Sequence, residues 1–227
     1  MTGINAVVFD LDGTLIEFRI DYQSIRQEAI EAIDQIKEIP MEIISSEISI
    51  FGMLNRISAY LDGRENAEAI TENLRSRLSR IANKYEVSAA QTTKMIPGAS
   101  QALKEIRVQG LKLGLFTTSG KEAMDRALRR FDLEKYFDAC VPRDDAPKVK
   151  PDPSHLNLVL KILGTSPNQA LVVGDTTLDI TCAKAAGVRS IGVLTGVHKQ
   201  NQLEAAGANY VINTLNELPP LVLKMGG

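Results

Sequence analysis

Short apolar runs rich in β-branched residues recur along the chain and predict β-strands. They lie at residues 4–9, 111–116, 138–141, 170–174, 189–194 and 209–213. Helical or turn-rich segments separate the later runs, and this alternation is typical of parallel strands joined by crossover helices. One such helix has clear end signals, because Asp152 and Pro153 open an apolar-periodic segment that Gly164 closes. The pattern predicts an α/β protein with a doubly wound, Rossmann-like parallel sheet.

The region between the first two apolar runs breaks this alternation. Its apolar residues recur only at steps of three and four, in three groups that Pro40 and Gly63 separate. This spacing predicts three helices packed as a small bundle. We therefore expect an α-helical cap domain at 19–91, inserted after the first strand, and an α/β core formed by 1–18 and 92–227.

Composition narrows the classes of partner. The 227 residues are 44% hydrophobic and carry a formal net charge of −2. Proteins that bind nucleic acids usually have more Lys and Arg than Asp and Glu, and this sequence has no such excess. No positively charged leader and no apolar run of membrane-spanning length is present, so we expect a cytoplasmic protein without a membrane partner. The two cysteines, Cys140 and Cys182, are isolated and expected to be reduced. The sequence leaves the oligomeric state open.

Polar side chains follow three of the predicted strands. In a parallel sheet, ligands bind in the crevice outside the carboxyl ends of the strands. We therefore expect the following side chains to meet there: Asp10 and Asp12 after the first strand, Thr117, Thr118 and Ser119 after the second, and Asp175 and Asp179 after residues 170–174.

Converging carboxylates repel one another unless a cation lies between them. Mg²⁺ is the expected ion, because it is held by a few carboxylate and carbonyl oxygens and by substrate phosphate oxygens. Asp10 and Asp175 would be direct ligands, and Asp12 would contribute a third through its backbone carbonyl. Asp179 is a further acid on the metal side, although taken alone it could simply cap a helix.

A phosphoryl group bound against such a metal needs further positive charge and hydrogen-bond donors. Thr117 and Thr118 can supply a hydroxyl and a backbone N–H. Lys150 is the expected cation, since Pro151 holds it extended before a helix start, and Lys148 is its nearby competitor.

Asp10 can act as a nucleophile on phosphorus, because an ionised carboxylate beside Mg²⁺ needs no separate base. Asp12 can protonate the leaving oxygen and then deprotonate water. Gly13 permits the tight turn after the pair, and Thr14 is placed to orient a carboxylate. The two histidines, His155 on a helix face and His198 in a loop, need no function.

Four motifs then appear in order: "DLDGT", "LFTTS", "KPDP" and "GDTTLD". The ordered set resembles the haloacid dehalogenase superfamily of phosphohydrolases over nearly the whole chain. The resemblance implies Asp10 as nucleophile, Asp12 as acid/base, Thr117 and Lys150 as phosphate binders, and Asp175 with Asp179 as metal-side acids. It also implies that the helical insert is a cap that closes over the site, as in relatives of phosphoglycolate phosphatase.

We therefore expect a Mg²⁺-dependent phosphomonoester hydrolase that acts on a small phosphorylated metabolite through an aspartyl-phosphate on Asp10. The segment "IEFRIDY" after the first motif and the Thr-Thr-Ser of the second depart from many cap-bearing relatives, so the substrate stays open. The alternative is a phosphosugar mutase of the same superfamily. A signalling receiver domain fits poorly, because its motifs come in another order. An inactive binding protein also fits poorly, because it would not need to keep every residue that the chemistry requires.

Overall fold

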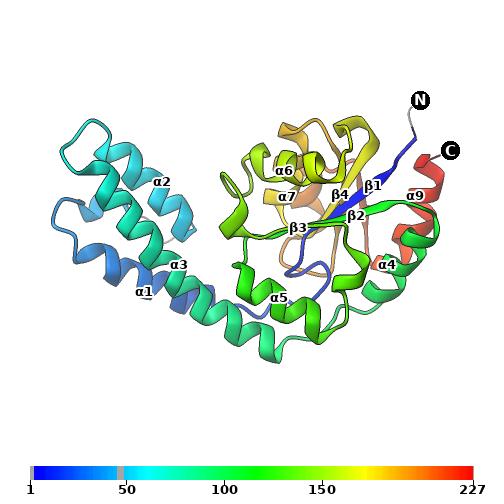
Figure 1. Ribbon diagram of the computed structural model, residues 1–227, viewed down its shortest axis with the longest axis horizontal. Helices are drawn as coiled ribbons and strands as arrows, with labels where there is room; N and C mark the ends of the chain where they lie inside the picture. Colours follow the sequence, from blue (N-terminus) through cyan, green and yellow to red (C-terminus); the bar gives the residue numbers. More distant parts are fainter. Residues whose placement is uncertain (1–2, 45–48, 227) are drawn as a thin grey trace. The chain divides into compact units, whose positions relative to one another are not determined.

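The computed structural model describes residues 3–44 and 49–226. Contacts between residues divide the chain into two compact units (Figure 1). The core unit consists of Met1–Arg19 together with Ala90–Gly227, and the helical unit consists of Ile20–Ala89.

A six-stranded parallel sheet forms the centre of the core unit in the part of the chain that the structure describes. Its order, β3-β2-β1-β4-β5-β6, reverses direction between β1 and β4, which is the switch point of a doubly wound sheet. The strands are β1 (Ala6–Phe9), β2 (Lys112–Phe116), β3 (Ala139–Val141), β4 (Ala170–Gly174), β5 (Arg189–Val193) and β6 (Tyr210–Ile212).

Helices cover both faces of this sheet, so its central strands are apolar on both sides. In β1, Val7 and Phe9 pack into one apolar cluster while Ala6 and Val8 pack into another. The first cluster includes side chains of α4 (Ala99–Val108), α5 (Lys121–Arg130) and α9 (Leu218–Gly226). The opposite face carries α6 (Pro153–Leu163), α7 (Thr177–Ala185) and α8 (Gln200–Ala206). The predicted α/β fold with a doubly wound parallel sheet is confirmed.

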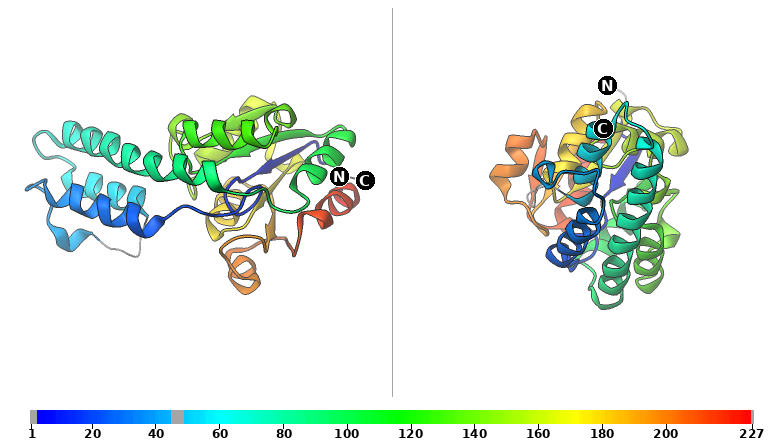
Figure 2. Two further views of the ribbon diagram at one scale, coloured as in Figure 1. Left: turned by 90° about the horizontal axis from the view of Figure 1, so that it is seen from below. Right: turned by 90° about the vertical axis from the view of Figure 1, so that its left-hand side faces the viewer.

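The helical unit contains α1 (Tyr22–Asp34), α2 (Ile50–Leu61) and α3 (Ala67–Thr92), the last of which ends in the residues of the core unit. The helices lie side by side (Figure 2) because the apolar positions at three- and four-residue steps share one buried cluster. Two of them begin at side-chain caps, where Asp21 accepts from Ser24 N and Ser49 accepts from Gly52 N. Among the described residues, no helix combines the length and apolarity that crossing a membrane requires.

Candidate active site

The order of the strands brings together the first and the fourth motifs, which carry the acids. Asp10 directly follows β1 and Asp175 directly follows β4, and these two strands are neighbours in the sheet. The Asp10 N–H donates to the carbonyl of Val173 at 2.9 Å, which holds the two strand ends in register. Both carboxylates therefore project from the switch point, where α/β proteins bind ligands.

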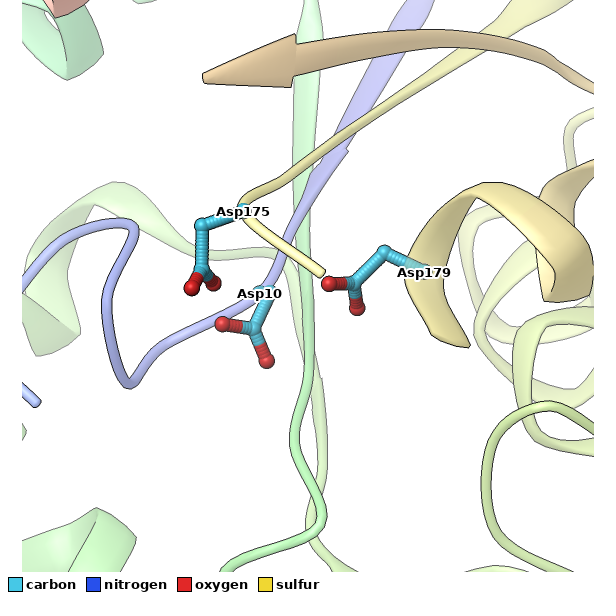
Figure 3. Close-up of side chains that lie close together, drawn as sticks. All are labelled: Asp10, Asp175 and Asp179. Atoms are coloured by element: carbon cyan, nitrogen blue, oxygen red, sulfur yellow. The ribbon is translucent and has the colours of Figure 1, made fainter. Parts of the chain in front are cut away.

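A third carboxylate completes this cluster from α7. Ligand oxygens of Asp10, Asp175 and Asp179 all lie within 4.8 Å of one another, and all three residues are buried (Figure 3). Asp179 also takes part in a capping box, because its carboxylate accepts hydrogen bonds from the backbone N–H of Thr176 at 3.0 Å and from its hydroxyl at 2.6 Å. Asp179 thus caps its helix and also faces the cluster.

Lys150 is the buried cation of the site. Its Nζ lies 2.5 Å from Oδ1 of Asp10 and 2.6 Å from Oδ1 of Asp179, and it also donates to the carbonyl of Phe116. Only 3% of the Lys150 side chain is exposed, whereas 76% of the Lys148 side chain is exposed. The structure therefore brings Lys150 into the site and leaves Lys148 at the surface.

The charges of this cluster do not balance. With all three buried carboxyl groups ionised, one ammonium would leave two uncompensated negative charges. Burial raises the pKa of Asp10 well above its ordinary value, against the opposing effect of Lys150, and burial together with the charge of Asp179 raises the pKa of Asp175 to about 7. One buried oxygen, Oδ2 of Asp10, has no hydrogen-bond partner. The donor set fits a hard divalent cation, which would balance both charges.

Asp175 is held from two loops. The Thr14 hydroxyl donates to its Oδ1 at 3.2 Å, which confirms the expected role of Thr14, and the Val197 N–H donates to its Oδ2 at 2.9 Å. Gly13, with a φ of +93°, and Gly196 both lie so close that a Cβ at either position would collide with the Asp175 carboxylate. These loops therefore fix the orientation of one potential metal ligand.

Asp12 faces a different group of residues. Its Oδ2 accepts from the Ser119 hydroxyl at 2.7 Å and from the Thr117 hydroxyl at 3.4 Å, and the Ser119 N–H donates to Oγ1 of Thr117. Thr118 contributes a carbonyl that accepts from the buried Arg143 guanidinium at 2.8 Å. The carboxyl end of β2 therefore carries a hydroxyl pair beside the second aspartate.

Sequence reasoning missed the roles of four residues at this edge. Ser119 had a usable signal, since it closes the run of three polar residues that follows β2. Thr195, whose hydroxyl donates to the Gly13 carbonyl at 2.7 Å, follows β5 and could have been found in the same way. Val197 acts through its backbone, and Arg143 lies in a loop with no motif, so neither has a signal in the residue types.

A groove of about 410 Å³ lies beside the loop that holds Asp175. It is lined by Glu17, Phe18, Arg19, Thr195, Gly196 and Val197. The Arg19 guanidinium is ion-paired with Glu17 at 2.6 Å, so its charge is already matched. The lining of the groove thus includes the apolar residues Phe18 and Val197 together with this ion pair.

Comparison with known proteins agrees with this geometry. The family model for haloacid dehalogenase-like hydrolases matches residues 7–193. The phosphoglycolate phosphatase of Nitrosospira multiformis is 28% identical over 97% of this chain and 96% of its own length. The pyrophosphatase PpaX of Bacillus mycoides is 25% identical over 99% of both chains. A solved Thermotoga maritima structure, provisionally assigned as a β-phosphoglucomutase, aligns with a TM-score of 0.64 and 27% identity, covering 97% of this chain and 99% of that one.

The chain belongs to the haloacid dehalogenase-like hydrolase family, since the family model covers more than half of it. The predictions of this family and of an enzyme of the hydrolase class are confirmed.

Proposed function

We propose that the protein is a Mg²⁺-dependent phosphomonoester hydrolase that acts on a small phosphorylated metabolite through an aspartyl-phosphate on Asp10. The observation that carries the proposal is the buried cluster of Asp10, Asp175 and Asp179 with Lys150, at the switch point of the sheet and with a second aspartate two residues after the first. We also propose a cytoplasmic location, because charged phosphate esters do not cross a bilayer unaided.

In this proposal Asp10 and Asp175 hold the metal with their carboxylates, and Asp12 adds its backbone carbonyl. Asp179 supports them from the metal side while it pairs with Lys150. Bound Mg²⁺ would lower the negative charge around the phosphoryl group and offset the repulsion among the carboxylates.

Asp10 attacks phosphorus with a carboxylate oxygen, which forms the acyl-phosphate bond as the bond to the leaving oxygen breaks. Lys150 compensates the charge of the transferring phosphoryl group, since its ammonium already lies at Asp10. Thr117 and Thr118 bind the remaining phosphoryl oxygens through a hydroxyl and a backbone N–H at the end of β2.

Asp12 carries the proton in both halves of the reaction. It gives a proton to the leaving oxygen in the first step and takes one from the water that attacks phosphorus in the second, which releases Asp10. Ser119 supports this role because its hydroxyl holds Oδ2 of Asp12 at 2.7 Å. We propose that residues 19–91 form a cap that selects the leaving group, with 1–18 and 92–227 as the core.

The relatives favour two substrate classes and one alternative reaction. Phosphoglycolate and pyrophosphate are the compounds in the names of the Nitrosospira and Bacillus proteins. The Thermotoga structure supports the alternative of a phosphosugar mutase, in which the phosphoryl group moves to another sugar hydroxyl instead of to water.

The test is phosphate release from a panel of phosphoglycolate, pyrophosphate, sugar phosphates and nucleotides, with Mg²⁺ and with EDTA. We expect selective release that needs Mg²⁺ and that falls at least about 10⁴-fold in Asp10→Asn, because loss of a nucleophile removes the covalent route. Asp62→Asn, at an exposed aspartate of the helical unit, is the matched control. No release, together with isomerisation of a sugar phosphate in the presence of its bisphosphate, would favour the mutase instead.

A further inference from the structure

A buried histidine joins the ends of the two strands next to the proposed phosphate site. His155 is the third residue of α6 and is 0% exposed. Its Nε2 lies 3.0 Å from the carbonyl oxygen of Val141, the last residue of β3. The same carbonyl accepts the Thr117 N–H at 3.2 Å. His155 and the Thr117 backbone therefore share one acceptor.

The partner of Nε2 determines the state of the ring. A carbonyl oxygen can only accept, so Nε2 carries a proton and donates it. The other nitrogen, Nδ1, is buried and has no hydrogen-bond partner. Burial and the nearby charge of Lys150 lower the pKa of His155 to about 4. The ring is thus a neutral donor at the pH of ordinary assays, and it has no access to substrate.

The same ring also supports the aromatic side chain under Lys150. It packs edge-on against Phe116, with ring centroids 5.5 Å apart and an interplanar angle of 67°. The Lys150 ammonium lies 4.1 Å from the centroid of the Phe116 ring and donates to the Phe116 carbonyl at 3.3 Å. One imidazole therefore contacts the supports of both Thr117 and Lys150.

We propose that His155 is a positioning residue that sets the geometry of the phosphate-binding pair, acting on Thr117 through the Val141 carbonyl and on Lys150 through Phe116. The catalytic consequence of this role depends on the proposed function. The hydrogen bond has the larger effect, because it fixes the direction of the Val141 carbonyl and hence of the Thr117 backbone N–H.

Two substitutions separate the hydrogen bond from the packing. His155→Phe keeps an aromatic ring but removes the donor, whereas His155→Gln keeps a donor N–H at the same number of bonds from Cα and removes the ring. In His155→Phe we expect kcat/KM per folded molecule to fall about tenfold and the inhibition constant of inorganic phosphate to rise about tenfold, because small displacements of binding groups have effects of this order. His155→Gln should stay within about threefold of the native protein in both quantities.

A second readout does not depend on turnover. Hydrogen exchange of the Thr117 amide, followed by NMR, should be faster in His155→Phe than in the native protein and close to native in His155→Gln. Equal losses of kcat/KM in the two variants would overturn the proposal. So would an exchange rate of the Thr117 amide in His155→Phe equal to that of the native protein. Absence of phosphatase activity in the native protein would overturn the proposed function alone, since amide exchange and direct titration with inorganic phosphate still decide the role of His155.

Discussion

The two units of the chain bury different kinds of side chain. The helical unit encloses an apolar cluster that includes Ile33, Leu54 and Leu74, and among its described residues Glu86 is the one buried polar side chain. The core unit has apolar clusters on both faces of its sheet, yet it also buries charged and hydroxyl groups at the carboxyl edge.

This difference separates residues that stabilise the fold from residues that serve the site. Apolar burial stabilises a unit at any pH, whereas a buried carboxylate costs free energy unless a cation or a proton compensates it. The stability of the core unit should therefore respond to charge, pH and metal ions, and that of the helical unit to the volume of its buried side chains.

Among the substitutions that compare the two units, removal of the buried cation should have the largest effect. Lys150→Met should lower kcat/KM about 10³-fold, because the phosphoryl group loses its compensating charge. It should also lower the free energy of unfolding at pH 7 by about 3 kcal/mol, because Asp10 and Asp179 lose their partner. Phosphate release and urea unfolding measure the two effects.

The neighbouring Lys148 offers a matched control. Lys148→Met removes the same charge at an exposed position, so the free energy of unfolding should change by no more than about 0.5 kcal/mol. Equal effects of the two substitutions would remove the distinction between site and surface.

A substitution in the helical unit should affect stability without affecting the metal site. Leu74→Ala creates a cavity at a fully buried position of α3, and we expect a loss of about 3 kcal/mol in the free energy of unfolding. The increase in melting temperature on addition of Mg²⁺ should be unchanged for the core unit. Leu223→Ala, at an exposed position, should have little effect on stability, and a Mg²⁺ response altered by Leu74→Ala would contradict the separation.

The core unit should respond to pH and Mg²⁺ together. The pKa of Asp175 is about 7 in the folded protein, against an ordinary value of 3.8. Between these two pH values the Asp175 carboxyl is therefore protonated in the folded state and ionised in the unfolded state. The contribution of Asp175 therefore favours folding below about pH 4 and declines as the pH rises towards 7 in metal-free protein.

Binding of Mg²⁺ should offset this decline in the stability of the core unit at higher pH. At a hundred times its dissociation constant it should add about 2.7 kcal/mol to the free energy of unfolding at pH 7.5, and less at pH 5, where protons compete for the carboxylates. Calorimetry at the two pH values, with and without the ion, measures both trends. A Mg²⁺ effect independent of pH, or one retained in Asp175→Asn, would contradict the assignment.

The smallest effect on Mg²⁺ binding is expected at Thr14, which supports the proposed metal ligand Asp175. Thr14→Val removes the hydroxyl that donates to Asp175 while nearly keeping the side-chain volume. We expect the stabilisation by Mg²⁺ to fall by about 1 kcal/mol, the usual contribution of one hydrogen bond. Isothermal titration with Mg²⁺ measures it, and an unchanged affinity would show that the Val197 N–H suffices to orient Asp175.

The sequence was sufficient for the fold and for the position of the acids. Continuous apolar runs such as those before Asp10 and Asp175 are typical of strands buried on both faces, and the acids follow them directly. Helical spacing in 19–91 predicted α1, α2 and α3, because the buried faces of these helices are wide and regular.

Other parts of the site have no signature in residue type. The Val197 N–H could belong to any residue except proline, so its bond to Asp175 depends on the path of the loop alone. His155 reads as an ordinary residue of an apolar helix face, and its contacts with Val141 and Phe116 follow from the pairing of β2 with β3. The contacts of His155 therefore depend on the order of the strands, which the alternation of elements does not specify.

The most direct test of the central claim is to locate the phosphoryl group during turnover. The native protein is mixed with Mg²⁺ and the best substrate of the panel, quenched in acid within one turnover, digested and analysed by mass spectrometry. We predict phosphorylation on the peptide that contains Asp10, labile to hydroxylamine as an acyl-phosphate is, and its loss in Asp10→Asn. Rapid phosphate release without a modified Asp10, or undiminished release by Asp10→Asn, would contradict the account.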